Sequence, residues 1–179
     1  MNDFCVDLEF NWSLFVEEYD IYSPPIGHSL LDTKYISKEF FECIDSINLK
    51  LQYIEIFVKT PYEKPGIHTD DGTVDMAKIN WIFNGNNSLM AWYKVKPNVQ
   101  PKPYISTINS YSEVYTDDMV ELIHTQRVGN PSIVRVGIPH SVYTLNTTRY
   151  CYSVVVRDKS NNSNLTFNEL CERFKQYIK

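Results

Sequence analysis

The chain has 179 residues, of which 43% are hydrophobic and 22% are charged, as in an ordinary globular protein. This length suits one domain, so we expect residues 1–179 to form a single domain with its own core. The formal net charge of −5 disfavours general binding to nucleic acid, because such binding needs a basic surface.

Three further observations indicate where the protein works. No apolar run approaches the roughly 20 residues of a membrane span, so no membrane association is expected. The acidic N-terminus lacks the basic and apolar regions of a secretory signal. The four cysteines are scattered, with neither metal-ligand spacing nor a disulfide framework. Together these features predict reduced thiols in a cytoplasmic protein, in the host cytoplasm if the chain is viral.

The N-terminal part of the chain is rich in aromatic residues. Leu8, Phe10 and Trp12 alternate with polar residues, which predicts a short strand. We expect the first 35 residues to pack on the core as a lid or edge. Ser37 can cap a helix whose apolar residues recur at helical spacing. The sequence therefore predicts a supporting helix from Ser37 to Leu49.

The middle of the chain is dominated by predicted strands. Leu51–Thr60 has apolar residues on both alternating faces, which predicts a strand covered on one side and partly covered on the other. Ala77–Phe83 and Ser88–Val95 flank Asn84-Gly85-Asn86-Asn87, a turn signal that predicts a hairpin between them. The Pro-rich segment Lys96–Tyr104 is expected to be irregular.

The last third continues this pattern and then changes. Strands are predicted within Met119–His124, Ser132–Ile138 and Arg149–Arg157. A capping box of Thr166 and Glu169 starts a predicted C-terminal helix over residues 166–178. The element order predicts a mainly β fold, a sandwich or jelly roll with a core at about residues 51–157 and one or two flanking helices.

Two histidines and one aspartate form the candidate site. His68 and Asp70 are two residues apart, so their side chains share one face of an extended chain. His140 follows the predicted strand that ends near Ile138. Two imidazoles and one carboxylate are the ligand set of non-haem Fe(II) oxygenases, which leaves coordination positions open. His124 is a rival for the distal ligand. We interpret it as a surface or strand-end histidine, because Arg127 follows it by only three residues, whereas Arg149 follows His140 by nine.

The order of these residues, with Arg149 nine positions after His140, resembles the 2-oxoglutarate/Fe(II)-dependent dioxygenase family over about residues 53–156. The resemblance implies a double-stranded β-helix, a jelly-roll or cupin-like fold. It also implies that His68, Asp70 and His140 bind Fe(II), and that Arg149 pairs with the distal carboxylate of 2-oxoglutarate. No catalytic residue beyond the metal site is predicted.

Two other residues are candidates for binding the co-substrate. The family often has Ser two residues after the Arg, where this chain has Cys151, and Ser153 lies two residues further on. Arg149, Cys151 and Ser153 would share one face of a strand. Asn80 is a polar residue inside an apolar strand, at about the place where related enzymes have a co-substrate contact. The alternative for Asn80 is a position that faces solvent.

The resemblance implies hydroxylation of a C–H bond in a peptide side chain or a small metabolite, with release of succinate and CO₂. Two alternatives remain open at this point: an inactive jelly-roll binding module, or a structural protein of a virus or phage. The second is suggested by a composition rich in Asn, Tyr, Lys and Ile. Taken singly, His68 and Asp70 could form a salt bridge in a loop, and His140 could be a histidine at a strand end.

Overall fold

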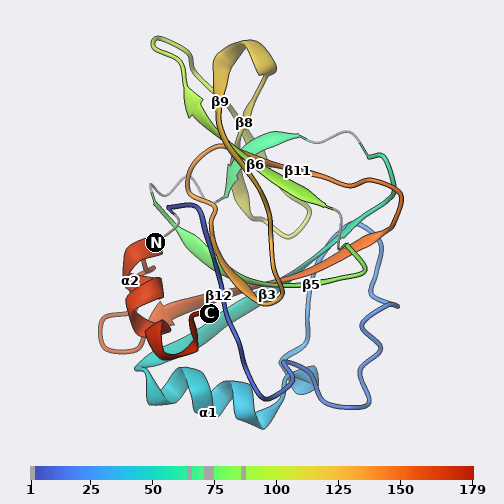
Figure 1. Cartoon of the computed structure of the whole chain (residues 1–179), viewed down its shortest axis with the longest axis vertical. Coiled ribbons are helices and arrows are strands. Elements are labelled where there is room, and N and C mark those ends of the chain that lie inside the picture. The colour runs from blue at the N-terminus through green and yellow to red at the C-terminus, as the bar shows by residue number, and fades with distance from the viewer. Residues whose placement is uncertain (1–2, 64–65, 71–74, 86–87) are drawn as a thin grey trace.

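The computed structural model of the protein describes residues 3–63, 66–70, 75–85 and 88–179. Within these residues, two antiparallel six-stranded sheets pack as a sandwich, accompanied by two short α-helices (Figure 1). The predicted mainly β, jelly-roll-like fold with flanking helices is therefore confirmed. None of the described helices is long and apolar enough to cross a membrane.

The first sheet is assembled from segments that are far apart in the chain. Its strands are, in spatial order, β1 (Cys5–Asp7), β10 (Ser132–Arg135), β5 (Ala77–Phe83), β12 (Arg149–Asp158), β3 (Leu49–Lys59) and β2 (His28–Leu30). The strands of the second sheet are, in spatial order, β7 (Lys102–Ile105), β8 (Tyr111–Tyr115), β4 (Ile67–Asp70), β11 (His140–Tyr143), β6 (Leu89–Val95) and β9 (Val120–Arg127).

Both helices pack against the first sheet. Helix α1 (Lys38–Ser46) contacts β3, and helix α2 (Phe167–Arg173) contacts β10 and β5. In Figure 1, α1 lies on the side of this sheet away from the strands of the second sheet. The Ser37 hydroxyl accepts a hydrogen bond from the Phe40 amide, and Thr166 and Glu169 form the predicted capping box.

The helices are shorter than predicted. Asn48 adopts a left-handed conformation (φ 60°), which ends α1 and allows β3 to start at Leu49. The C-terminal prediction divides into α2 and a separate 3₁₀ turn at Lys175–Tyr177. In both places the start of the helix was predictable from its cap, whereas its end depends on a local change of backbone direction.

The two faces of the first sheet have different surroundings. Ile54, Ile79 and Val154 belong to an apolar cluster shared with helix residues such as Phe40 and Leu170. The alternate positions of the same strands point to the interior of the sandwich, where Met90, Trp92, Val134, Val136 and Val155 form a second cluster. Coverage of both faces explains why neither face of the predicted strand 51–60 was wholly polar.

The predicted hairpin between Ala77–Phe83 and Ser88–Val95 is wrong. Both strands exist, but β5 pairs with β10 and β12, while β6 pairs with β11 and β9. The two strands therefore belong to different sheets, and the connection crosses from one layer to the other. Asn84 does have a positive φ of 54°, whereas Asn86 and Asn87 of the turn signal lie outside the described residues.

Two smaller predictions also need correction. The N-terminal strand is Cys5–Asp7 rather than a strand through Phe10 and Trp12, whose rings stack on one another at a centroid distance of 4.3 Å. The segment Lys96–Tyr104 is not irregular throughout, because β7 starts at Lys102. Strand β7 lies at the edge of its sheet, where a proline is tolerated.

Candidate metal centre

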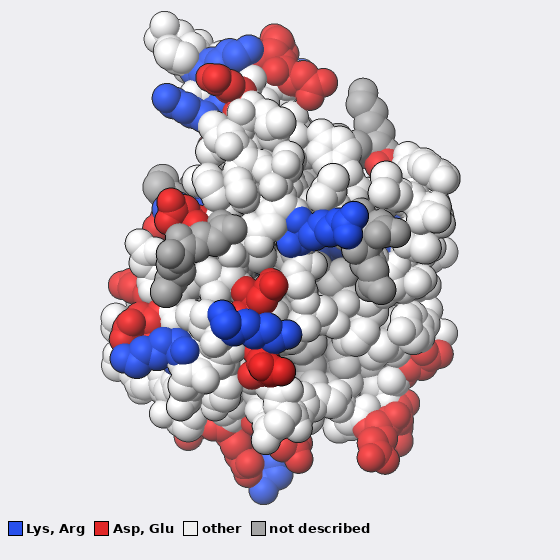
Figure 2. All heavy atoms as spheres, in the orientation of Figure 1, with Lys and Arg blue, Asp and Glu red and all other residues white. Residues whose placement is uncertain are grey.

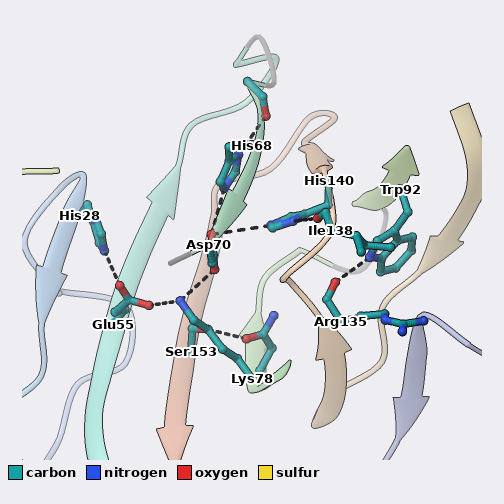
Figure 3. Close-up of polar contacts among 12 residues, drawn as sticks. His28, Glu55, His68, Asp70, Lys78, Trp92, Arg135, Ile138, His140 and Ser153 are labelled. Carbon is teal, nitrogen blue, oxygen red and sulfur yellow. Dashed lines mark hydrogen bonds and ion pairs between the residues drawn. The ribbon is translucent and has the colours of Figure 1, made fainter. Parts of the chain in front are cut away.

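His68, Asp70 and His140 meet between the two sheets. His68 on β4 is the direct antiparallel partner of His140 on β11, and their ring centroids are 4.5 Å apart. The Nε2 atoms of His68 and His140 lie 3.4 Å and 3.9 Å from Oδ1 of Asp70. One ligand atom from each residue lies within 4.8 Å of the other two. The three side chains converge in Figure 3 and form a candidate metal-binding triad.

Backbone carbonyl groups orient both imidazoles. The Nδ1 atom of His68 is 3.2 Å from the oxygen of Gly66, and Nδ1 of His140 is 3.0 Å from the oxygen of Ile138. Because a carbonyl oxygen can only accept a hydrogen bond, each Nδ1 must carry the proton. The neutral form of each ring therefore presents the lone pair of Nε2 to Asp70. Such hydrogen bonds fix ligand orientation at metal sites.

The site also favours ligands without protons. Burial, followed by the nearby His68, lowers the pKa of His140 to about 4. Burial alone would raise the pKa of Asp70, but the ion pair with Lys78 and the two imidazoles hold that pKa well below its usual range. At neutral pH His140 is therefore neutral and Asp70 is a carboxylate, the protonation states in which these two side chains bind a metal ion.

Behind Asp70 lies a network of buried ionised groups that the sequence did not reveal. The Nζ atom of Lys78 is 2.8 Å from Oδ2 of Asp70, and it also forms an ion pair with Glu55. The other carboxylate oxygen of Glu55 lies 3.2 Å from Nε2 of His28. Lys78 and Glu55 are both fully buried. In the sequence, Lys78 is the one charged residue of Ala77–Phe83, and Glu55 is one of several polar residues of the predicted strand Leu51–Thr60.

The three predicted co-substrate contacts lie in the same cavity as the triad, which we call the inner cavity. It has a volume of about 60 Å³, room for several water-sized groups. Arg149, Asn80 and Ser153 line it together with His68, Asp70 and His140. Ser153 donates a 2.7 Å hydrogen bond to Oδ1 of Asn80. Asn80 is thus buried at the cavity rather than exposed to solvent, and Cys151 also lines this wall.

The guanidinium of Arg149 lacks a carboxylate partner among the described residues. Its side chain is buried, and its Nε atom has no hydrogen-bond partner in the described part of the chain. A Cβ atom at Gly85 would lie 2.8 Å from Cγ of Arg149, so the glycine leaves the space that Arg149 occupies. A buried donor nitrogen of a cationic group that has no hydrogen-bond partner is unfavourable unless something binds it.

A second cavity, which we call the outer cavity, also has His68 and Asp70 in its lining. Its volume is about 210 Å³, and its lining includes His28 and Phe57 from the first sheet, with Tyr104 and Ser112 from the second. The ring of His28 stacks on Phe57 at a centroid distance of 4.3 Å. The two carboxylates in this lining, Asp70 and Glu55, are both paired with Lys78, so the described lining carries no unpaired charge.

Two further residues, His124 and Ser141, are not part of the triad. His124 sits within β9 and stacks on Phe4, so it is not among the triad and not at a strand end. Ser141 hydrogen-bonds to the hydroxyl of Tyr93 rather than to a metal ligand. Asp71, a neighbour for which no role was predicted, lies outside the described residues.

Comparison with known proteins does not assign the chain to a family. No protein-family model, no curated protein and no solved structure matches it. The structure itself shows a β-sandwich with a candidate His-Asp-His metal-binding triad between its sheets.

Proposed function

We propose that this protein is a non-haem Fe(II) and 2-oxoglutarate-dependent dioxygenase. The observation that carries the proposal is the inner cavity itself. It combines a His-Asp-His triad with a buried guanidinium that has no carboxylate partner in the described chain. The first feature suits a divalent metal ion, and the second suits a carboxylate.

The charges of the inner cavity support a metal ion together with a dianion. Asp70 and Arg149 line the cavity, and Lys78 and Glu55 lie behind Asp70, so these groups contribute two negative and two positive charges. Lys59 also lines the cavity, but it is paired with Glu63 at 3.5 Å, so the charges of all six groups are balanced. A divalent metal ion would add two positive charges, and 2-oxoglutarate would bring two negative charges. Binding both together would restore neutrality in a buried site, where an uncompensated charge is costly.

Each group has a defined role in this proposal. His68, Asp70 and His140 would hold Fe(II), and Arg149 would bind the distal carboxylate of 2-oxoglutarate, with Asn80 and Ser153 as further polar contacts. When bound, the metal and co-substrate would supply oxidative decarboxylation: R–H, 2-oxoglutarate and O₂ would yield R–OH, succinate and CO₂. The protein would orient the reactants and exclude bulk water from the space between the sheets.

The outer cavity would take the substrate. It shares His68 and Asp70 with the inner cavity, and Arg149 is not in its lining. Because its described lining has no unpaired charge, it suits an uncharged part of a peptide side chain or small molecule. On the face shown in Figure 2, acidic and basic side chains are interspersed. This mixture and the net charge of −5 support a substrate other than nucleic acid.

The test is anaerobic mixing of the protein with Fe(II) and 2-oxoglutarate. A visible charge-transfer absorption is expected for wild type, and succinate release is expected once O₂ is admitted. His68→Ala should lose bound metal and absorption, whereas the matched variant His124→Ala should keep both. Metal content that is unaffected by His68→Ala would contradict the proposal and favour a binding module or a structural protein.

A further inference from the structure

The two oxygens of Asp70 have different partners. Oδ1 faces the imidazoles of His68 and His140 at 3.4 Å and 3.9 Å. Oδ2 lies 2.8 Å from Nζ of Lys78. Lys78 is 1% exposed, so water does not compete for this contact. The carboxylate thus presents one oxygen to the candidate metal position and the other to a buried ammonium group.

Lys78 is itself held from its other side. Its Nζ also pairs with Oε2 of Glu55, while Oε1 of Glu55 accepts a hydrogen bond from Nε2 of His28 at 3.2 Å. Glu55 is 0% exposed. The ammonium group of Lys78 is therefore held between the two carboxylates (Figure 3).

This arrangement has a consequence for metal coordination. A carboxylate with two accessible oxygens can bind a metal through both and occupy two coordination positions. A charge-assisted hydrogen bond at Oδ2 opposes that, because the ammonium would have to leave its contact and would repel the incoming cation. A keto acid that chelates through two atoms, with a further position for O₂, needs three open positions.

We propose that Lys78 is a positioning residue that restricts Asp70 to metal binding through one oxygen, and that Glu55 and His28 hold Lys78 in place. The inference rests on the metal centre of the proposed function. It concerns the number of coordination positions left open, which the triad alone does not determine.

The test counts metal-bound water molecules. The protein is loaded with Mn(II) without co-substrate, and the broadening of its electron paramagnetic resonance lines in ¹⁷O-labelled water gives the number of bound waters. Wild type is expected to show about three, as for three protein ligands in an octahedral site. Lys78→Met frees Oδ2, so we expect about two waters, and the affinity for 2-oxoglutarate should fall roughly 10-fold or more, as for loss of an outer-shell partner.

Two variants serve as controls. Glu55→Gln keeps a side-chain oxygen that can accept a hydrogen bond from Lys78, so Lys78 should stay on Asp70 and the water count should equal that of wild type. Lys94→Met removes an exposed lysine of β6 and should change neither the count nor the affinity. If Lys78→Met does not fold, Glu55→Gln/Lys78→Met removes one of the two carboxylates left unpaired, and the same loss of one water is expected.

A purely structural role for Lys78 gives a different result. In that case Lys78→Met would lower thermal stability, or tighten Mn(II) binding by removing a nearby positive charge, while the water count stayed at the wild-type value. That result would overturn the inference. Failure of wild type to bind 2-oxoglutarate would instead contradict the proposed function, and the water count would still decide the role of Lys78.

Discussion

Successive residues of strand β5 point to two different regions, the helices on one side and the interior of the sandwich on the other. Ile79 and Trp81 point to the helices and belong to the apolar cluster on that face. Lys78 and Asn80 point into the sandwich, where they contact Asp70 and Ser153. Burying an aliphatic side chain stabilises the fold by roughly 1.5–3 kcal/mol, whereas a buried ion pair contributes little net stability. One face of this strand therefore stabilises the fold, and the other lines the candidate metal centre.

The largest expected effect is the loss of metal affinity when a triad ligand, on the side of the candidate metal centre, is removed. His140→Ala should weaken Co(II) binding by more than the roughly 10–100-fold that loss of an outer partner causes, because it removes a direct ligand atom. Isothermal titration calorimetry checks this. His124→Ala is the matched control, and equal losses of affinity in both variants would show that the effect is not specific to the triad.

The helix face should respond in stability instead. Ile79→Ala removes a side chain with 0% exposure, so the free energy of unfolding should fall by about 2–5 kcal/mol. Urea denaturation measures this change, and Co(II) affinity of the folded variant should stay near that of wild type. Ile123→Ala, at a residue 46% exposed on β9, should remain within about 0.5 kcal/mol. A large loss of metal affinity in Ile79→Ala would show that the two faces are not independent.

Arg149 should affect the co-substrate and spare the metal. Arg149→Met removes charge-assisted hydrogen bonds worth about 1.5–3 kcal/mol, so 2-oxoglutarate should bind roughly 10–100-fold more weakly, as measured by anaerobic titration of the absorption band. Arg157→Met, at the other end of β12, removes a guanidinium that bonds to Gln52 and serves as the control. Undiminished 2-oxoglutarate affinity in Arg149→Met would assign the distal carboxylate to another residue.

The stability of the metal-free protein should depend on pH because of a residue of the candidate metal centre, His140. The pKa of His140 is lowered from 6.5 to about 4 by burial and then by His68, so between these values the unfolded chain binds the proton more readily. The free energy of unfolding should therefore fall as pH drops from about 6.5 to about 4, with a slope of up to about 1.4 kcal/mol per pH unit. Urea denaturation in chelator-treated buffer checks this. His140→Gln should flatten the slope, and an unchanged slope would exclude His140 as its source.

The smallest expected effect comes from the backbone beside Arg149. Gly85→Ala places a Cβ atom 2.8 Å from Cγ of Arg149, so Arg149 must move, and 2-oxoglutarate affinity should fall a few-fold. In Gly66→Ala, by contrast, the added Cβ meets nothing within 4 Å, and the affinity should be unchanged. Anaerobic titration of both variants measures the difference, and equal affinities would show that the position of Arg149 is not critical.

The parts of the candidate site that could be predicted are those that depend on spacing along a single strand. His68 and Asp70 were predicted to share a face from their spacing alone, and the structure brings them to His140. Arg149, Cys151 and Ser153 line one cavity, as their alternation along a strand implied. Asn80 lies there too, because β5 pairs with β12 in the register that opposes Asn80 and Ser153.

What could not be predicted depends on contacts between distant segments. The Asn-Gly turn indicated a change of direction but not which strands would pair, and β5 and β6 entered different sheets. Lys78 and Glu55 resembled exposed positions of alternating strands, since a single charged residue does not reveal its partner. Only the pairing of β3, β12 and β5 brings Lys78 and Glu55 together behind Asp70.

The most direct test of the metal centre is the position of a bound ion. A crystal grown with Co(II) under anaerobic conditions and measured at the cobalt absorption edge should give one anomalous peak between Nε2 of His68, Nε2 of His140 and Oδ1 of Asp70. A peak bound to other groups, or the absence of a peak at saturating Co(II), would contradict the account.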